Sequence, residues 1–438
     1  MLKPAATVTE QVLRPSYDPQ RRAWGILLLS FAAFCAICVV AGVSISYFLF
    51  QSTVSLESLL RVGRGTGVVS GQAVYSERVL VLGDTLSTDG QSQATIFFTD
   101  TQSENRLIAM VTLKGGTEMS FRRTLRPRFD WGSSSYGIEL ERLSGELDVF
   151  VMPFLQRDVR LTIRTVPGDL IDIQSSGQYR ISATETRARV ENVNGSASLI
   201  PANQNVGRSI PANNQGIVNY TGDATSVLTS PAKVNLITSS TFEDPDVIAQ
   251  SWVCSNREDT PPSGRYYLER TNGRMVMRML RADGATSNGE TRCLTSFGQY
   301  GLDVAAYTYL ELRVMFNIQY QSLEVCGTQG SECPLMLRID YRDQQGASRQ
   351  WIHGFYSRPN PQLNYPLYCL SCTQEHELVN ASTWYTYDTG NLLSFFAPGE
   401  RPISIVNVQF YASGHQYDVL VSDVSLLAGS TDDPTALN

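Results

Sequence analysis

The cysteines are the residues of this 438-residue chain whose type and spacing could do chemistry. Cys35 and Cys38 lie in an apolar stretch near the N-terminus, where we expect them to pack as hydrophobic side chains. The other six fall in the C-terminal half: Cys254, Cys293, Cys326, Cys333, Cys369 and Cys372. An even number confined to one region predicts disulfides in an oxidising compartment. The simplest pairing is Cys254–Cys293, Cys326–Cys333 and Cys369–Cys372.

A zinc site is the alternative chemistry for four of these cysteines. Cys326-x6-Cys333 and Cys369-Leu-Ser-Cys372 could supply four thiolates, which suit Zn²⁺. The first spacing is looser than that of most zinc sites, so we favour disulfides. Spacing alone does not fix the connectivity, because six cysteines can pair in many ways.

Motifs for catalysis are missing from the sequence. It contains no Gly-x-Ser-x-Gly elbow, phosphate-binding loop, His-Glu-x-x-His or EF-hand loop. The three histidines, His353, His376 and His415, leave little material for imidazole catalysis, and we expect each to be structural. We therefore expect a protein that is not an enzyme. A glycan-active enzyme, with two carboxylates facing each other across a cleft, is the alternative.

Charge and composition narrow the class of protein further. The net charge is −7, with 35 basic against 42 acidic residues, so no basic excess indicates binding to nucleic acid. Hydrophobic residues make up 42% and charged residues 18%, a balance typical of globular rather than disordered chains.

Residues 23–50 contain no charged side chain and predict a transmembrane helix. A helix needs about 20 apolar residues to span a bilayer, and Trp24 and Tyr47 stand near the ends, where aromatic rings favour the headgroup region. The alternative is a cleaved signal peptide, whose apolar stretch is shorter, about 7–15 residues. We favour an uncleaved anchor in the cell membrane.

The flanking charges predict the orientation of this helix. Arg21 and Arg22 directly precede it, whereas the first basic residues after it are Arg61 and Arg64. The positive-inside bias places residues 1–22 in the cytoplasm as a short tail. The bulk of the chain is then extracytoplasmic, which agrees with the predicted disulfides.

Residues 52–200 predict a β-rich domain, because short alternating runs are separated by turn residues. The run from Arg61 to Phe98, with the turn Gly83-Asp84-Thr85-Leu86-Ser87-Thr88, resembles the opening of a FecR-type domain. The resemblance implies an all-β, sandwich-like or rolled domain outside the cytoplasm. Signalling members of that family carry a long cytoplasmic anti-sigma region, whereas here we expect only the short tail of residues 1–22.

Residues 201–236 are rich in Pro, Asn, Gly and Ser and predict a linker, of which Gln215–Ile217 could finish the first domain as an edge strand. Residues 237–428 again read as strands separated by Gly, Pro and Asn, which predicts a β-sandwich or jelly roll. We expect residues 429–438 to form a disordered tail.

The second domain resembles jelly-roll carbohydrate-binding modules at its two ends, Phe242-Glu243-Asp244 and Val421–Leu426. The resemblance implies that these ends pair and that Glu243 and Asp423 hold a structural calcium ion, since two uncompensated carboxylates would otherwise repel. Two unrelated surface carboxylates are the alternative.

Exposed aromatic rings could stack on sugars in this domain. Among many candidates we single out Trp351, Tyr356 and Trp384. The alternative is that they are core residues, as most aromatic residues of a sandwich are.

The sequence thus predicts a mainly β, single-pass, non-enzymatic cell-envelope protein that binds a glycan or a protein partner. Two alternatives stay open: a transmembrane signalling protein of the FecR type, and an accessory subunit of a membrane complex.

Overall fold

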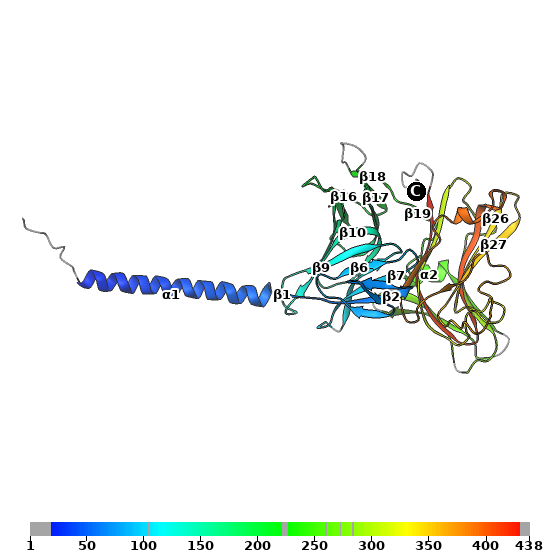
Figure 1. The fold of residues 1–438 in the computed structure, drawn as a ribbon, viewed down its shortest axis with the longest axis horizontal. Coiled ribbons are helices and arrows are strands. Elements are labelled where there is room, and N and C mark those ends of the chain that lie inside the picture. The colour runs from blue at the N-terminus through cyan, green and yellow to red at the C-terminus, as the bar shows by residue number, and fades with distance from the viewer. Residues whose placement is uncertain are drawn as a thin grey trace, which may run out of the picture. The chain divides into compact units, whose positions relative to one another are not determined.

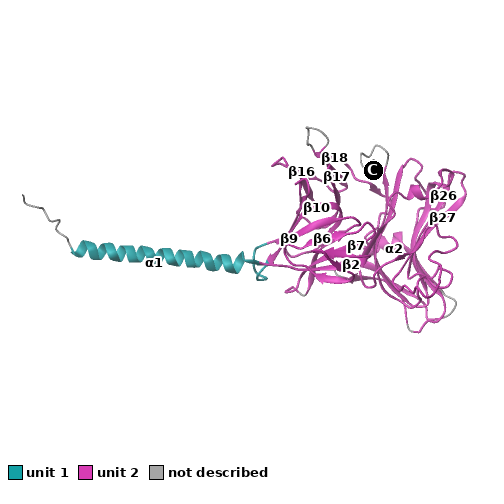
Figure 2. Ribbon diagram, in the orientation of Figure 1, with its two compact units in different colours: residues 1–53, 127–134 teal, residues 54–126, 135–438 magenta. Residues whose placement is uncertain are grey.

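The computed structural model describes residues 19–103, 105–220, 227–258, 261–271, 273–282 and 284–429. Most of the expected cytoplasmic tail (1–18) and nearly all of the expected disordered tail (430–438) lie outside these ranges. The chain divides into two compact units (Figure 2). The anchor unit comprises residues 1–53 and 127–134, and the β unit comprises residues 54–126 and 135–438.

The anchor unit contains one long helix, α1 (Pro19–Phe50), which is the apolar helix expected from the sequence (Figure 1). It is long and apolar enough to cross a membrane, and none of its residues is buried in the protein. Its length follows from an uninterrupted run of apolar residues without proline after position 19.

The loop 127–134 closes over the last carbonyls of α1, which have no partner within a helix. The Ser133 backbone N–H and Oγ donate to the Phe50 carbonyl at 2.8 and 3.1 Å, and Ser134 Oγ donates to the Gln51 carbonyl at 3.1 Å. Phe129 stands edge-on to Phe48, with ring centroids 5.7 Å apart, and stacks on Trp131. The loop is thus a polar and aromatic cap on the helix end.

The β unit contains two β bodies. The first β body is formed by residues 54–126 and 135–231, and the second by residues 232–429. Together they make the protein mainly β, as expected.

Strands of the first β body close into a barrel. They are β1 (Thr53–Val54), β2 (Glu57–Arg64), β3 (Gly67–Val69), β4 (Gln72–Val74), β5 (Glu77–Val79), β6 (Thr85–Thr88), β7 (Gln93–Asp100), β8 (Arg106–Leu113), β9 (Glu118–Pro127), β10 (Tyr136–Val151), β11 (Val159–Thr165), β12 (Leu170–Ile173), β13 (Gly177–Ala183), β14 (Arg187–Asn194), β15 (Ala197–Ile200), β16 (Arg208–Ile210), β17 (Asn214–Asn219) and β18 (Val227–Pro231).

The long strand β10 joins the two halves of this barrel. Its first part pairs with β9 and β11, and its second part pairs with β8 and β13. The change occurs at Gly145, whose φ is +112° and where a Cβ would lie 2.6 Å from the Thr117 Cα. Only glycine fits such a backbone so close to its neighbour.

The Gly83-Asp84 turn has a structural role. Asp84 is buried and accepts hydrogen bonds from the Val81 N–H at 2.9 Å and from Ser70 Oγ at 2.7 Å. Its carboxylate therefore fixes the turn between β5 and β6.

Much of the expected linker belongs to the first β body. β16 pairs with β15, β17 pairs with β14, and β18 pairs with β17. The expected edge strand at Gln215–Ile217 lies within β17.

The second β body is a sandwich of two sheets with orders β21-β22-β31-β25-β29 and β20-β23-β30-β26-β27-β28. Its elements are β19 (Val234–Asn235), α2 (Pro245–Ser251), β20 (Val253–Glu258), β21 (Arg265–Thr271), β22 (Arg274–Arg281), β23 (Gly289–Ser296), β24 (Leu302–Asp303), β25 (Tyr309–Gln321), β26 (Leu335–Asp343), β27 (Ser348–Tyr356), β28 (Glu377–Leu378), β29 (Tyr385–Asp388), the 3-10 turns η1 (Leu392–Phe395) and η2 (Pro398–Glu400), β30 (Pro402–Gly414) and β31 (Tyr417–Gly429). The start of this body meets β31 through β19, which pairs antiparallel with Leu427–Ala428, and through the Val424 N–H, which donates to the Ser240 carbonyl at 2.9 Å. Phe242–Asp244, the end expected to pair, lies outside the strands.

The two β bodies pack directly against each other. A buried apolar cluster takes Phe97, Met110 and Met152 from the first body; the second body contributes Val276, Met315, Trp384 and Leu420. The side-chain amide of Gln93 also pairs with the Thr386 backbone, donating at 2.9 Å and accepting at 2.8 Å. This interface positions the candidate site.

Candidate functional site

A charged cavity of about 280 Å³ lies between the two β bodies. Five basic and five acidic side chains line it, drawn from both bodies. We call it the interbody chamber. Two of the chain's three lysines, Lys114 and Lys233, are among its lining residues.

One wall of the chamber is a row of charges across neighbouring strands of the first β body. Asp148 on β10 is paired in register with Arg180 on β13, which is paired with Glu191 on β14. Directly opposed residues share one face of a sheet, and alternating signs favour the pairing. Arg180 and Arg189 both form ion pairs with Glu191, at 3.4 and 3.3 Å.

The facing wall comes from the second β body. Tyr309, Glu311 and Arg313 occupy alternate positions on β25 and therefore point to the same side of its sheet. Asp388 on β29 is paired in register with Arg313. The inward positions between them, Leu310 and Leu312, are fully buried in the core. Strand alternation thus separates the charged wall from the apolar core.

Ion pairs cross the chamber and join the two walls. Arg313 forms an ion pair with Asp148 of the first body. Lys114 of the first body lies 2.6 Å from the Asp388 carboxylate and also donates to the Thr386 carbonyl at 3.0 Å. The charges that line the chamber therefore also hold its walls together.

A second group of contacts surrounds Glu311. Lys233 forms an ion pair with it at 3.1 Å, and the Tyr309 hydroxyl donates to it at 2.8 Å. The Lys233 ammonium also lies 3.6 Å from the centroid of the Tyr309 ring, so that face of the ring is occupied by a cation.

The pKa values of the chamber carboxyls separate into two groups. Burial would raise the pKa of Asp148, but the charges of Arg313 and Lys114 hold it well below its usual range. Burial would also raise the pKa of Glu311, but the charges of Arg180, Lys233 and Arg313 lower it to about 2. Partial loss of solvent and the nearby charges of Asp388 and Asp148 raise the pKa of Glu146.

Glu146 differs from the other chamber carboxylates in its surroundings. Its side chain remains exposed to solvent within the chamber, and no ion pair joins it to another described residue. It is therefore the carboxyl most available to a ligand.

The disulfide prediction is confirmed in full. The structure contains Cys254–Cys293, Cys326–Cys333 and Cys369–Cys372. Cys35 and Cys38 are free in α1. The alternative of a four-thiolate zinc site is wrong for this oxidised protein, because all four sulfurs are in disulfides.

Glu243 and Asp423 have protein partners. Glu243 forms an ion pair with Arg270 at 3.4 Å, whereas Asp423 accepts hydrogen bonds from Ser425 Oγ at 2.7 Å and Gln178 Nε2 at 3.3 Å. The buried guanidinium of Arg274 is close enough for the charges of both carboxylates to act on it. Burial nevertheless lowers the pKa of Arg274 to about 10. Calcium binding here stays a prediction, which melting with EDTA against excess Ca²⁺ would test.

The three aromatic residues singled out for sugar stacking are buried. Trp351 is 0%, Tyr356 7% and Trp384 3% exposed. Trp351 lies in the sandwich core, and Trp384 lies in the interface between the bodies. None of them therefore presents an open ring face to a sugar. The prediction failed because alternation along a strand shows which residues share a face, but not which face is covered.

Sequence reasoning missed the interbody chamber. The available signal was charge placed at alternate positions in otherwise apolar strands, at Glu146 and Asp148 and again at Glu311 and Arg313. None of the three histidines lines the chamber.

Neither a protein family nor a curated protein matches the chain. Among solved structures, it is similar to a candidate anti-sigma factor from Parabacteroides distasonis, with 16% identity over 38% of this chain and 72% of that one and a TM-score of 0.24. It is also similar to a family 11 carbohydrate-binding module from Clostridium thermocellum, with 11% identity over 45% and 97% of the two chains and a TM-score of 0.27.

A third similar structure is the xylan-binding CBM22-1 domain of Paenibacillus barcinonensis Xyn10C, with 12% identity over 46% and 99% of the two chains and a TM-score of 0.27. At such low identities and TM-scores, these similarities establish neither a family nor a function for this chain.

Proposed function

We propose that this protein is a membrane-anchored, non-enzymatic binding protein that displays its β unit outside the cytoplasm and binds a polar glycan in the interbody chamber. The observation that carries the proposal is the chamber itself, where five basic and five acidic side chains converge around a cavity of about 280 Å³.

Retention of α1 as an anchor is supported by the loop 127–134. This loop donates three hydrogen bonds to the Phe50 and Gln51 carbonyls and packs Phe129 on Phe48. Cleavage after the helix would remove from the loop the carbonyls and the aromatic ring that it contacts. Arg21 and Arg22 at the start of α1 favour a cytoplasmic N-terminus, and three disulfides suit an oxidising compartment outside it.

A glycan fits the chemistry of the chamber. Sugar hydroxyls both donate and accept hydrogen bonds, so they can satisfy a lining of alternating ammonium, guanidinium and carboxylate groups. The net charge of the lining is close to balanced, which does not favour a strongly charged ligand.

Binding is favoured over catalysis because most chamber carboxylates are committed to ion pairs. Asp148 pairs with Arg313, Glu311 with Lys233, and Asp388 with Lys114. A general acid and base must be free to exchange protons with a substrate, and only Glu146 meets that condition among the acidic residues of the chamber.

The test is a glycan array with the full-length protein in mild detergent, followed by calorimetry on each hit. Glu146→Gln should weaken binding by about tenfold, the effect expected when one hydrogen bond to a charged group is lost. Glu118→Gln, an exposed glutamate of the same body, is the matched control and should bind normally. The proposal is overturned if no glycan binds, or if a bound glycan is indifferent to Glu146→Gln.

A further inference from the structure

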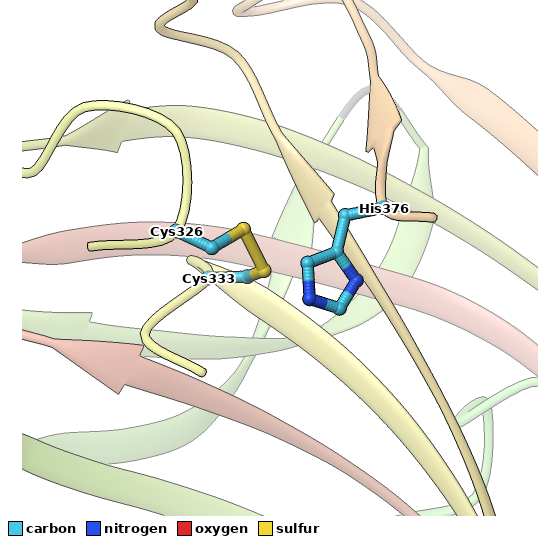
Figure 3. Close-up of side chains that lie close together, drawn as sticks. All are labelled: Cys326, Cys333 and His376. Carbon is cyan, nitrogen blue, oxygen red and sulfur yellow. A yellow bond between two sulfur atoms is a disulfide. The ribbon is translucent and has the colours of Figure 1, made fainter. Parts of the chain in front are cut away.

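A second cluster of reactive side chains lies away from the chamber, on the outer face of β26 and β27. Figure 3 shows the His376 ring beside the Cys326–Cys333 disulfide. A ring nitrogen of His376 and the two Sγ atoms all lie within 4.8 Å of one another. Both cysteines and the histidine are buried, at 0% and 5% exposure.

The hydrogen bonds of His376 fix which nitrogen carries its proton. Nε2 lies 2.7 Å from the Gly330 carbonyl oxygen, which can only accept, so Nε2 is the protonated nitrogen. Nδ1 then presents a lone pair, and it has no hydrogen-bond partner in the described part of the chain. A histidine that donates one N–H to a carbonyl and leaves the other nitrogen bare is oriented as metal-binding histidines are.

A third soft donor atom reaches the same point. A Cβ built on Gly354 would lie 2.5 Å from Met336 Sδ, 2.6 Å from Cys333 Sγ and 2.7 Å from His376 Nδ1. The thioether, the cysteine sulfur and the bare nitrogen therefore converge over the Gly354 Cα. A residue with a side chain cannot occupy position 354 without displacing them.

We propose that these groups form a Cu⁺ site once the Cys326–Cys333 disulfide is reduced, with two thiolates, the Met336 thioether and the His376 Nδ1 as ligands. A sulfur in a disulfide is a poor ligand, whereas the thiolate binds metals. Thiolates and imidazole suit both Zn²⁺ and Cu⁺, but zinc sites are built from Cys, His and carboxylate ligands. The Met336 thioether therefore favours Cu⁺.

The Cys326–Cys333 disulfide is reduced by thiol–disulfide exchange. A protein dithiol delivers two electrons and two protons to the Cys326–Cys333 bond and becomes a disulfide itself. The two new thiols lose their protons to solvent when Cu⁺ binds, and the copper keeps its oxidation state. The disulfide state shown here is then the form that does not bind copper, and the reduced state is the form that does.

The experiment uses the full-length chain in mild detergent, with the other six cysteines replaced by serine, and a chromophoric Cu⁺ chelator as competitor. After reduction with a phosphine and removal of the reductant without air, one Cu⁺ should bind per chain; the oxidised protein should leave the copper with the chelator. X-ray absorption should report sulfur and nitrogen ligands.

Met336→Leu is the deciding variant, because leucine keeps the volume of the core. It should lower the Cu⁺ affinity by about tenfold or more, since even the outer-shell partners of metal ligands contribute about 10–100-fold, while circular dichroism and the melting temperature stay unchanged. Met275→Leu, a methionine of the same body outside the cluster, is its control. Equal Cu⁺ binding by the oxidised protein, or by Met336→Leu, overturns the proposal.

If the six-serine background does not fold, only Cys369 and Cys372 are replaced by serine, because this neighbouring pair could also bind Cu⁺ once reduced. This protein is then compared with and without Met336→Leu after full reduction. The tightest Cu⁺ equivalent should then be weaker in the variant, and an identical affinity in both proteins overturns the proposal.

Discussion

Arg313 on β25 of the second β body forms an ion pair with Asp148 on β10 of the first. Only 11% and 17% of the two side chains are exposed. The register of each strand sets both sides of this contact, because Asp148 lies opposite Arg180 and Arg313 lies opposite Asp388. Together with Lys114–Asp388, this pair therefore joins the charge networks of the two bodies.

Replacing Arg313 with methionine should destabilise the β unit by about 3–5 kcal/mol, since it leaves Asp148 as a buried charge without its main partner. Chemical denaturation at pH 7 measures the change. Arg61→Met is the control, because the Arg61–Glu77 pair is 40% and 58% exposed and should contribute at most about 1 kcal/mol. Equal losses of stability in the two variants would contradict a special role for the Arg313–Asp148 ion pair between the bodies.

Adding Asp148→Leu to Arg313→Met should restore most of the lost stability. The double variant removes both buried charges, and apolar replacements of a buried ion pair are often neutral or better. Non-additivity in the double-mutant cycle measures the coupling between the residues. Additive losses would mean that each residue acts through other neighbours.

The pKa of Glu311, lowered to about 2, gives the second β body a defined acid sensitivity. A carboxyl whose pKa is lower in the folded than in the unfolded state contributes stability that is present above the unfolded value, near 4.5. That contribution is lost as the pH falls toward 2. Glu311→Gln should therefore flatten the pH dependence of unfolding between about pH 4.5 and 2, and an unchanged profile would contradict the assignment.

The contribution of Glu146 to stability should change with pH in the opposite direction to that of Glu311. Its pKa is raised in the folded state, so the folded protein binds the proton more readily and this group's contribution to stability falls as the pH rises. Glu146→Gln should modestly raise the melting temperature at pH 7 and have less effect below the pKa of the free carboxyl. Thermal melts of Glu146→Gln and of the control Glu118→Gln, at pH 7 and at a pH below the pKa of the free carboxyl, test the direction of this change. A lower melting temperature for Glu146→Gln at pH 7 would contradict it.

Features set by nearby residues could be predicted from the sequence. The helix α1 follows from one continuous apolar run, and Cys326–Cys333 and Cys369–Cys372 each close a short segment. Cys254–Cys293 is the pair that remains after these two, and the structure places its residues opposite each other on β20 and β23. Each of these depends on local pattern or on the small number of cysteines available.

The interbody chamber could not be predicted in the same way. Lys114 and Asp388 are 274 residues apart, and their contact exists only because sheets of the two β bodies pack together. Strand alternation predicts that Tyr309, Glu311 and Arg313 share a face, but it does not say that another body covers that face. The burial of Trp384 escaped prediction for the same reason, because the first body covers it. Trp351 lies in the core of its own sandwich, which is the alternative left open by the sequence.

The aromatic cap on α1 should lie in the headgroup region of the membrane. Trp131 is 63% exposed and stacks on Phe129, which contacts Phe48 near the end of the helix. Tryptophan favours the membrane interface, where its ring is partly buried and its N–H stays hydrated. In vesicles containing lipids brominated near the headgroup end of the acyl chains, Trp131 fluorescence should be quenched.

The quenched signal is isolated by comparing the wild-type protein with Trp131→Phe, since phenylalanine keeps the stack on Phe129 and removes the fluorophore. The variant should lose a shallow-quenched component while Trp24, at the opposite end of α1, keeps its own. Lipids brominated at the end of the acyl chain should quench Trp131 less, because the loop follows the helix end and not its middle. If aqueous iodide quenches Trp131 and brominated lipids do not, the cap stands clear of the bilayer and serves only to satisfy the Phe50 and Gln51 carbonyls.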